Sequence, residues 1–195
     1  MKTVASKRQE EIISVAGQLI RTKGLKGLTT KNLALEMGFS ESALYRHFKN
    51  KEDIIVLLLN HLADTMQKRF EDFPNEEISA VDQLQQLFAN QFHFFYHNPQ
   101  FVVAVLSEGL FDETETIKQA IQRIITLKSQ LLMSIVEQGK KNKELKTSFS
   151  SEEFVHILMG SFRLIMLKWK FSNFTLDLLS KGNTQMHTTI QLLQA

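Results

Sequence analysis

Apolar residues recur along most of this chain at intervals of three and four positions, which is the spacing of one face of an α-helix. The first stripe of this kind consists of Ile12, Val15, Ala16, Leu19 and Ile20. Nearly every later segment follows the same helical period rather than the alternation typical of a strand. The pattern therefore predicts an all-α protein of about nine helices.

Residues that start and stop helices divide the chain further. Ser150 and Glu153 have the spacing of a capping box and predict the start of an apolar helix. Gly139 is expected to end the long helix before it, with a polar loop at 140–144. The helices expected in the second part of the chain are 78–97, 99–107, 113–138, 151–171 and 184–194.

The most informative stretch is residues 28–53, where two short predicted helices meet at Gly38. A glycine in a tight turn between short amphipathic helices is typical of a helix-turn-helix, which binds DNA through its second helix. In that second helix, expected from Ser40 to His47, Leu44 should pack inward together with Phe48. The side chains left facing outward are those of Glu41, Ser42, Ala43, Tyr45, Arg46 and His47.

Two segments, Leu28–Phe39 and Ala43–Ile54, resemble the DNA-binding domain of the TetR family of bacterial regulators. The dense run Leu44-Tyr-Arg-His-Phe-Lys-Asn-Lys-Glu52 carries most of this resemblance. The resemblance implies a homodimeric repressor with a three-helix helix-turn-helix head at 1–53. It also implies a helical ligand-binding and dimerisation body at 54–195.

Individual contacts to DNA follow from the same resemblance. Thr30 matches a phosphate-contacting position of the second helix, and Lys31 matches a basic position that reaches a base or a phosphate. Relatives often have Gly-Thr or Pro-Thr where this chain has Ser42-Ala43, so this chain lacks a threonine that would reach a base or a phosphate. The variable recognition positions are Glu41, Ser42, Ala43 and Arg46, and the usual backbone-contacting positions are Tyr45, His47 and Lys51.

Some of these residues have a second interpretation from the sequence. Tyr45 and His47 could instead brace neighbouring helices, and Glu41 could only favour the positive end of its helix dipole. In the body, His93 and His97 are spaced four apart on one helix face, but two ligands do not make a metal site. We therefore predict no metal and no cofactor.

The body is rich in aromatic residues, and core packing alone would account for most of them. Four neighbouring rings at 92 and 94–96 cannot all face one stripe, which favours an apolar ligand pocket. The candidate pocket residues are Phe92, Phe95, Tyr96, Phe111, Phe162 and Trp169. Small residues inside the apolar helix 151–171 favour close helix approach at a four-helix dimer interface, with an ordinary buried helix as the alternative. The candidate interface residues are Phe154, Leu158, Gly160, Met186, Ile190 and Leu193.

Charge and composition narrow the class of protein. Residues 1–53 hold ten Lys/Arg against six Asp/Glu, while the whole chain carries a formal charge of only +2. This asymmetry favours a nucleic-acid contact near the N-terminal end. The chain has no cysteine, no apolar run of membrane-spanning length and no apolar leader, so we expect a cytoplasmic bacterial protein without a membrane partner.

The sequence thus predicts a DNA-binding transcriptional regulator and not an enzyme. The leading interpretation is a repressor that binds a near-palindromic double-stranded operator. A small, largely apolar effector releases the repressor from this operator. The alternative is a DNA-binding regulator, or a nucleoid or division factor, whose body binds a protein partner.

Overall fold

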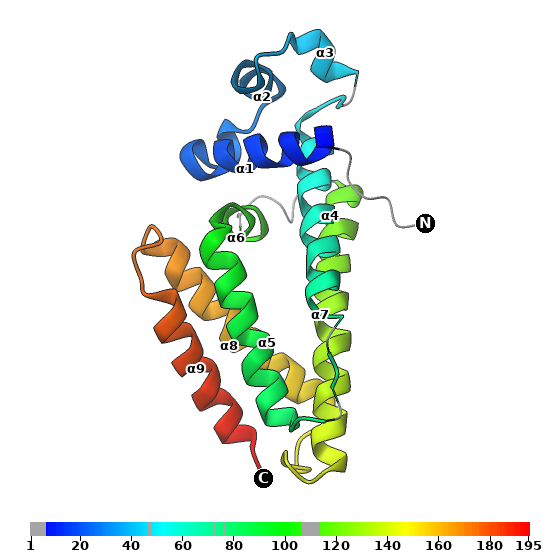
Figure 1. Ribbon diagram of the computed structural model, residues 1–195, viewed down its shortest axis with the longest axis vertical. Helices are drawn as coiled ribbons and strands as arrows, with labels where there is room; N and C mark the ends of the chain where they lie inside the picture. Colours follow the sequence, from blue (N-terminus) through cyan, green and yellow to red (C-terminus); the bar gives the residue numbers. More distant parts are fainter. Residues whose placement is uncertain (1–6, 47, 72, 76, 107–113) are drawn as a thin grey trace. The chain divides into compact units, whose positions relative to one another are not determined.

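The computed structural model describes residues 7–46, 48–71, 73–75, 77–106 and 114–195. Within these residues the chain forms helices joined by short connections, and its only β-type pairing is an isolated bridge between Leu145 and Gln194. The all-α prediction is confirmed for this part of the chain. The helices, labelled in Figure 1, are α1 (Lys7–Gly27), α2 (Thr30–Met37), α3 (Glu41–Tyr45), α4 (Lys51–Arg69), α5 (Ala80–His97), α6 (Pro99–Val105), α7 (Glu115–Lys141), α8 (Ser151–Phe171) and α9 (Leu178–Leu193).

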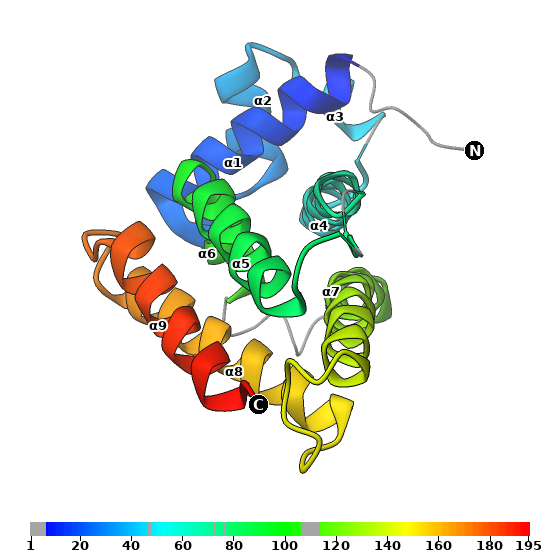
Figure 2. The ribbon, with the colours of Figure 1, turned by 60° about the horizontal axis from the view of Figure 1, so that its bottom comes forward.

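Internal contacts group the described residues into two compact units. One unit takes in those within Met1–Thr65 and Pro99–Ile124, and the other those within Met66–Asn98 and Ile125–Ala195. In the first unit α1 packs on α2 and α6, and α2 packs on α3. In the second unit α9 runs beside α5 and α8 in both ribbon views (Figures 1 and 2). The functional division at residues 53 and 54 stays a prediction.

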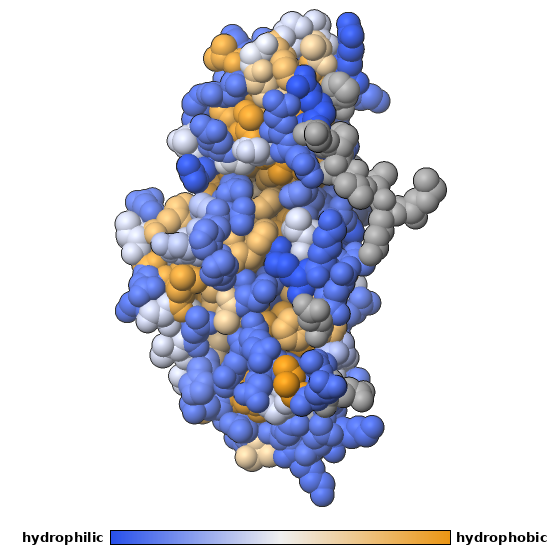
Figure 3. Space-filling model, in the orientation of Figure 1, coloured by the Kyte–Doolittle hydropathy of each residue, from blue (hydrophilic) through white to orange (hydrophobic). Residues whose placement is uncertain are grey.

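Each unit has an apolar interior that follows the predicted stripes. In the first unit the stripe of α1 is buried at Ile12, Ala16, Leu19 and Ile20, with Val15 half-buried. In the second unit large rings from α5 and α8 lie inside. The face of the molecule drawn in Figure 3 is mostly hydrophilic and carries smaller hydrophobic areas.

The capping box before α8 is confirmed. The Ser150 hydroxyl accepts the Glu153 backbone N–H at 3.1 Å, and the Glu153 carboxylate accepts the Ser150 N–H at 2.6 Å. These hydrogen bonds stabilise the ionised carboxylate, and they lower the pKa of Glu153 below its ordinary value. The helix then runs to Phe171, as its apolar pattern predicts.

The prediction that Gly139 ends its helix is wrong. Helix α7 continues to Lys141, and the left-handed residue after it is Lys143, with φ of 61°. A Cβ at position 139 would lie 2.6 Å from the Cβ of Ala80, so the glycine permits close packing inside the helix. A glycine used for packing and a glycine used as a helix end look alike in one sequence.

Helix α9 begins six residues before the predicted start at 184. Asp177 caps it by accepting the Ser180 N–H at 3.1 Å. Gly182 lies within the helix, where a Cβ would come 2.9 Å from the ring of Phe92. Helix α3 ends at Tyr45, two residues before its predicted end. Helix α4 ends at Arg69.

Candidate nucleic-acid interface

Side-chain capping fixes the start of α2 and the residues of its first turn. The Thr29 hydroxyl accepts the Asn32 N–H at 3.0 Å, and Asn32 Nδ2 donates to the carbonyl of Gly27 at 2.8 Å. Directly after the cap, Thr30 is half-buried and Lys31 is exposed. Both predicted DNA-contacting residues of α2 therefore lie in a turn with a fixed backbone.

The turn between α2 and α3 depends on the backbone freedom of Gly38. Its φ of 67° and ψ of 30° are left-handed, and nothing lies within 4 Å of a Cβ built there. Glycine is thus needed for conformation rather than for space. The Phe39 N–H then reaches back to the Ala34 carbonyl at 2.9 Å, and Ser40 caps α3 by accepting the Ala43 N–H at 3.2 Å.

The buried and exposed sides of α3 follow the sequence pattern. Leu44 is buried, as is Phe48 just after the helix. Ala43 is half-buried, and His47 lies outside the described residues. The exposed side carries an acid, two hydroxyls and a guanidinium, groups that hydrogen-bond base edges and phosphates. These are Glu41, Ser42, Tyr45 and Arg46.

Two of the predicted DNA-contacting residues touch each other. The hydroxyl oxygens of Thr30 and Tyr45 lie 3.2 Å apart, which links the first turn of α2 to the end of α3. Tyr45 is nevertheless 50% exposed. The two interpretations of Tyr45, as a brace and as a contact for DNA, are therefore compatible.

Two hydrogen bonds that involve Asp53 cap the start of α4. Asn50 Oδ1 accepts the Asp53 N–H at 3.0 Å, and the Asp53 carboxylate accepts the Lys49 N–H at 2.7 Å. Lys51 is the first residue of the helix, and its side chain is half-buried. An acid next to this helix start offsets part of the attraction that the helix dipole offers to a phosphate. The Lys51 ammonium is thus the group at this helix start best suited to meet DNA.

The sequence pattern did not identify Arg8 as a residue of this region. Its guanidinium carbon lies 3.8 Å from the centroid of the Phe39 ring, and its Nη1 pairs with Glu11 at 2.9 Å. The ring belongs to the turn between α2 and α3, so Arg8 fastens α1 to that turn. Arg8 lies outside the helix-turn-helix window, and no local pattern indicates this contact.

In the second unit, the described residues of the predicted pocket pack on one another. Phe92, Phe95, Phe162 and Trp169 are buried, Tyr96 is exposed, and Phe111 lies outside the described residues. The ring of Phe162 lies 5.2 Å from that of Phe92 and 6.2 Å from that of Phe95. The Tyr96 and Trp169 rings stack at 6.5 Å.

Two buried polar residues of this ring cluster were not predicted from the sequence. Lys128 on α7 is 6% exposed, and Gln91 on α5 is fully buried. Burial lowers the pKa of Lys128 from 10.5 to about 7. Lys128 lies four residues after Ile124 and three before Leu131, so it completes the apolar stripe of α7. This position in the helical repeat is the sequence signal that would have identified Lys128 as buried.

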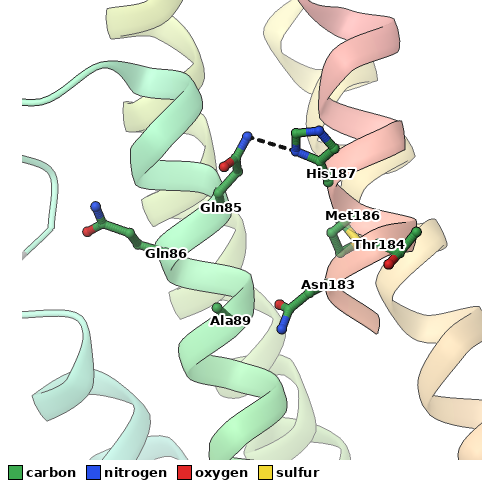
Figure 4. Close-up of a pocket in the computed structure, with 7 residues that line it drawn as sticks. All are labelled: Gln85, Gln86, Ala89, Asn183, Thr184, Met186 and His187. Atoms are coloured by element: carbon green, nitrogen blue, oxygen red, sulfur yellow. Dashed lines mark hydrogen bonds between the residues drawn. The ribbon is translucent and has the colours of Figure 1, made fainter. Parts of the chain in front are cut away.

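A cavity of about 490 Å³ lies at the surface of α5 and α9 (Figure 4). Gln85 Nε2 and His187 Nδ1 approach each other across it at 3.1 Å. Five of its seven lining residues have polar side chains, and none of the seven was predicted to line a ligand pocket. The lining residues are Gln85, Gln86, Ala89, Asn183, Thr184, Met186 and His187.

The residues predicted for the dimer interface do not form one exposed surface. Five of them lie inside the second unit of their own chain: Phe154, Leu158, Met186, Ile190 and Leu193. Gly160 is exposed, with nothing within 4 Å of a Cβ built on it. On the same side of α8, Ile157, Leu164 and Phe171 follow one another at intervals of seven residues, and all three are exposed. We call Ile157, Gly160, Leu164 and Phe171 the outer stripe of α8.

Neither a metal cluster nor a membrane span is found in the described parts of the chain. The rings of His93 and His97 lie 4.5 Å apart, and His97 Nδ1 lies 2.9 Å from the His93 carbonyl oxygen. No group of three or more His, Cys, Asp or Glu residues there could hold a metal ion. The helices there are all too short or too polar to cross a membrane.

Comparisons with known proteins agree with the geometry of the head. Residues 12–58 match the family model described as bacterial regulatory proteins, tetR family. The chain is 27% identical over 139 residues to the nucleoid occlusion factor SlmA of Vibrio atlanticus (strain LGP32), covering 71% of each chain.

Solved structures share the whole fold. A transcriptional regulator FadR from Bacillus subtilis, in complex with stearoyl-CoA, superposes with a TM-score of 0.81 at 21% identity and covers 95% of this chain and 98% of its own. The fatty acid degradation regulator FadR from Bacillus halodurans gives a TM-score of 0.83 at 17% identity, covering 96% of each chain. At these identities the likeness is one of fold.

Proposed function

Because this chain belongs to the TetR family of bacterial regulatory proteins, we propose that it is a homodimeric transcriptional repressor. The repressor binds a near-palindromic operator and leaves it when a small effector binds the body. The observation that carries the DNA-binding role is the exposed polar side of α3, held against α2 by the Gly38 turn. Its role is binding, and the proposal assigns no catalytic step.

Each predicted DNA-contacting residue of the head has a proposed role. Arg46 reads a base edge, and Glu41 accepts a hydrogen bond from a base amine such as that of cytosine. The hydroxyl pair of Thr30 and Tyr45 binds a phosphate, since hydroxyl groups position a protein on the DNA backbone. Lys31 and Lys51 add positive charge beside the backbone, and Ser42, Ala43 and His47 complete the proposed contact surface.

Replacing Arg46 by alanine tests base readout. Affinity for the operator should fall by about 1–3 kcal/mol, and preference should relax at one base pair of each half-site. Fluorescence anisotropy on the operator and on its single-base variants measures both effects, once the operator is found by footprinting on DNA upstream of the gene. Lys26→Ala removes an exposed charge outside α2 and α3 and serves as the control. An equal loss on every sequence would assign Arg46 to the phosphate contacts.

Replacing Lys51 by alanine tests the phosphate contact. Removing one phosphate-neutralising charge per protomer should weaken binding to all sequences alike. It should also lower the slope of log affinity against log salt by about one for each phosphate that is no longer neutralised. Anisotropy titrations at several salt concentrations give the slope. An unchanged slope would contradict the phosphate contact.

The outer stripe of α8 is the surface proposed to meet a second copy of the chain. Its side chains are exposed, whereas Phe154, Leu158 and Ile165 on the same helix are buried, so the chain's own core does not cover the stripe. Repeats of seven residues keep a stripe in contact with a partner helix over several turns. A two-fold axis beside α8 would bring two such stripes together, and Gly160 would let the backbones approach closely.

Two kinds of partner are proposed for the body. The aromatic interior of the second unit favours an apolar small molecule. The likeness to SlmA favours, as a second candidate, a nucleoid occlusion factor whose body binds a protein. Melting-temperature shifts against a metabolite library separate the two, because a bound effector stabilises the folded protein. A shift that also releases operator DNA supports the repressor. The second candidate is supported if the protein arrests cell division, if this arrest is lost without Arg46, and if no metabolite shifts the melting temperature.

A further inference from the structure

Lys128 lies among aromatic rings inside the second unit. Its ammonium nitrogen is 3.3 Å from the ring centroid of Phe162 and 5.3 Å from that of Phe88. In the part of the chain that the structure describes, the ion pairs formed by side chains do not include this lysine. A nearly fully buried cation therefore has two ring faces as its neighbours.

Ring faces compensate this charge only in part. A desolvated cation–π contact recovers only part of the cost of burying an ammonium, even after the protein relaxes. The balance is unfavourable, and the lowered pKa of Lys128 reflects the same cost. Costly buried charges of this kind concentrate at functional sites.

Further polar atoms along the same helices are also buried without a hydrogen bond. Both the amide oxygen and the amide nitrogen of Gln91 are unsatisfied in the described structure, and so is Trp169 Nε1. Gln91 lies one turn after Phe88 on the buried side of α5, and Trp169 lies two turns after Phe162 on α8. Unsatisfied buried groups are costly, so their presence on the two helices whose rings contact a buried cation indicates a site for a ligand with polar atoms.

We propose that Lys128 is the counter-ion for the carboxylate of a largely apolar, singly charged ligand bound between α5, α7 and α8. Gln91 hydrogen-bonds the same carboxylate, and the rings of Phe88, Phe92 and Phe162 contact the apolar part. This inference rests on the proposed effector-binding function and specifies the chemical class of the effector.

Matched pairs of ligands test this assignment at pH 7. The probes are octanoate, palmitate and 1-naphthoate, each paired with the corresponding alcohol. Trp169, the only tryptophan, is buried beside Tyr96 and Phe174, so its fluorescence reports binding. At least one carboxylate should bind about thirty-fold or more tightly than its alcohol, because the alcohol leaves the buried charge unpaired. The chain-like and aromatic probes show which apolar part fits.

Two lysine variants make the test specific. Lys128→Met should abolish the preference for the carboxylate, whereas Lys141→Met, which removes an exposed charge from the same helix, should keep it. Equal affinity for acid and alcohol, a preference that survives in Lys128→Met, or no binding of any carboxylate would overturn the assignment. Operator affinity without ligand is measured in parallel. Its absence would refute the proposed repressor function and leave the result for carboxylates standing.

Discussion

Gly160→Glu should convert the proposed dimer to monomers and weaken operator binding by about 100-fold or more, because two linked heads gain this much avidity over one. The substitution adds a carboxylate to the outer stripe of α8. Nothing lies within 4 Å of a Cβ at this position, so the isolated chain accommodates the new side chain. In the dimer the two-fold axis doubles the effect, and each unpaired buried carboxylate costs several kcal/mol.

Sedimentation velocity and anisotropy on operator DNA measure the two effects of Gly160→Glu. Gln119→Glu adds the same charge to an exposed site on α7, so it should leave both mass and affinity unchanged. The thermal midpoint of the variant at high dilution should match that of the diluted wild type. A Gly160→Glu protein that remains a dimer would show that the outer stripe of α8 is not the interface.

Lys128→Met should raise the free energy of unfolding at pH 7 by on the order of 2–4 kcal/mol, since methionine fills the same space without a charge to desolvate. The pKa of Lys128 is about 7 in the folded chain and 10.5 in the unfolded reference. Between these values the unfolded chain binds a proton that the folded chain does not. Wild-type stability should therefore increase as pH rises from 7 toward 10, by up to about 1.4 kcal/mol per unit from this group.

Urea unfolding at pH 7, 8 and 9 tests this pH dependence. The contribution of Lys128 is the difference between wild type and Lys128→Met, and it should shrink as pH rises. Below pH 7 both states bind the proton, so the difference should level off there at its largest value. Lys141→Met should follow the wild type throughout. A constant difference across this range would mean that Lys128 keeps an ordinary pKa in the folded protein.

Local rules predicted much of the fold from the sequence. The Ser150 and Glu153 capping box, the Gly38 turn and the buried Leu44 each depend on residues within a few positions of one another. Two of the errors arose where a glycine packs against a distant neighbour. Gly139 packs against Ala80 and Gly182 against Phe92, and such close approaches are decided by the tertiary structure.

The two candidate sites differed in how far the sequence could predict them. The DNA-binding surface lies on one short motif, so spacing alone predicted that Tyr45 and Arg46 would be exposed. The body site joins α5, α7 and α8, whose relative positions no local pattern encodes. Lys128 escaped prediction because a lysine is normally assigned to the solvent side, although its phase with Ile124 and Leu131 places it inside.

The hydroxyl contact between Thr30 and Tyr45 fixes part of the proposed DNA-binding surface before any DNA is present. A phosphate would then meet two oxygen atoms already in position, so Thr30 and Tyr45 would not need to order around it. Calorimetric titrations over a range of temperatures would register this as a heat-capacity change no larger than rigid docking requires, without the excess that coupled folding adds. Tyr45→Phe, which removes this hydroxyl contact, should add that excess.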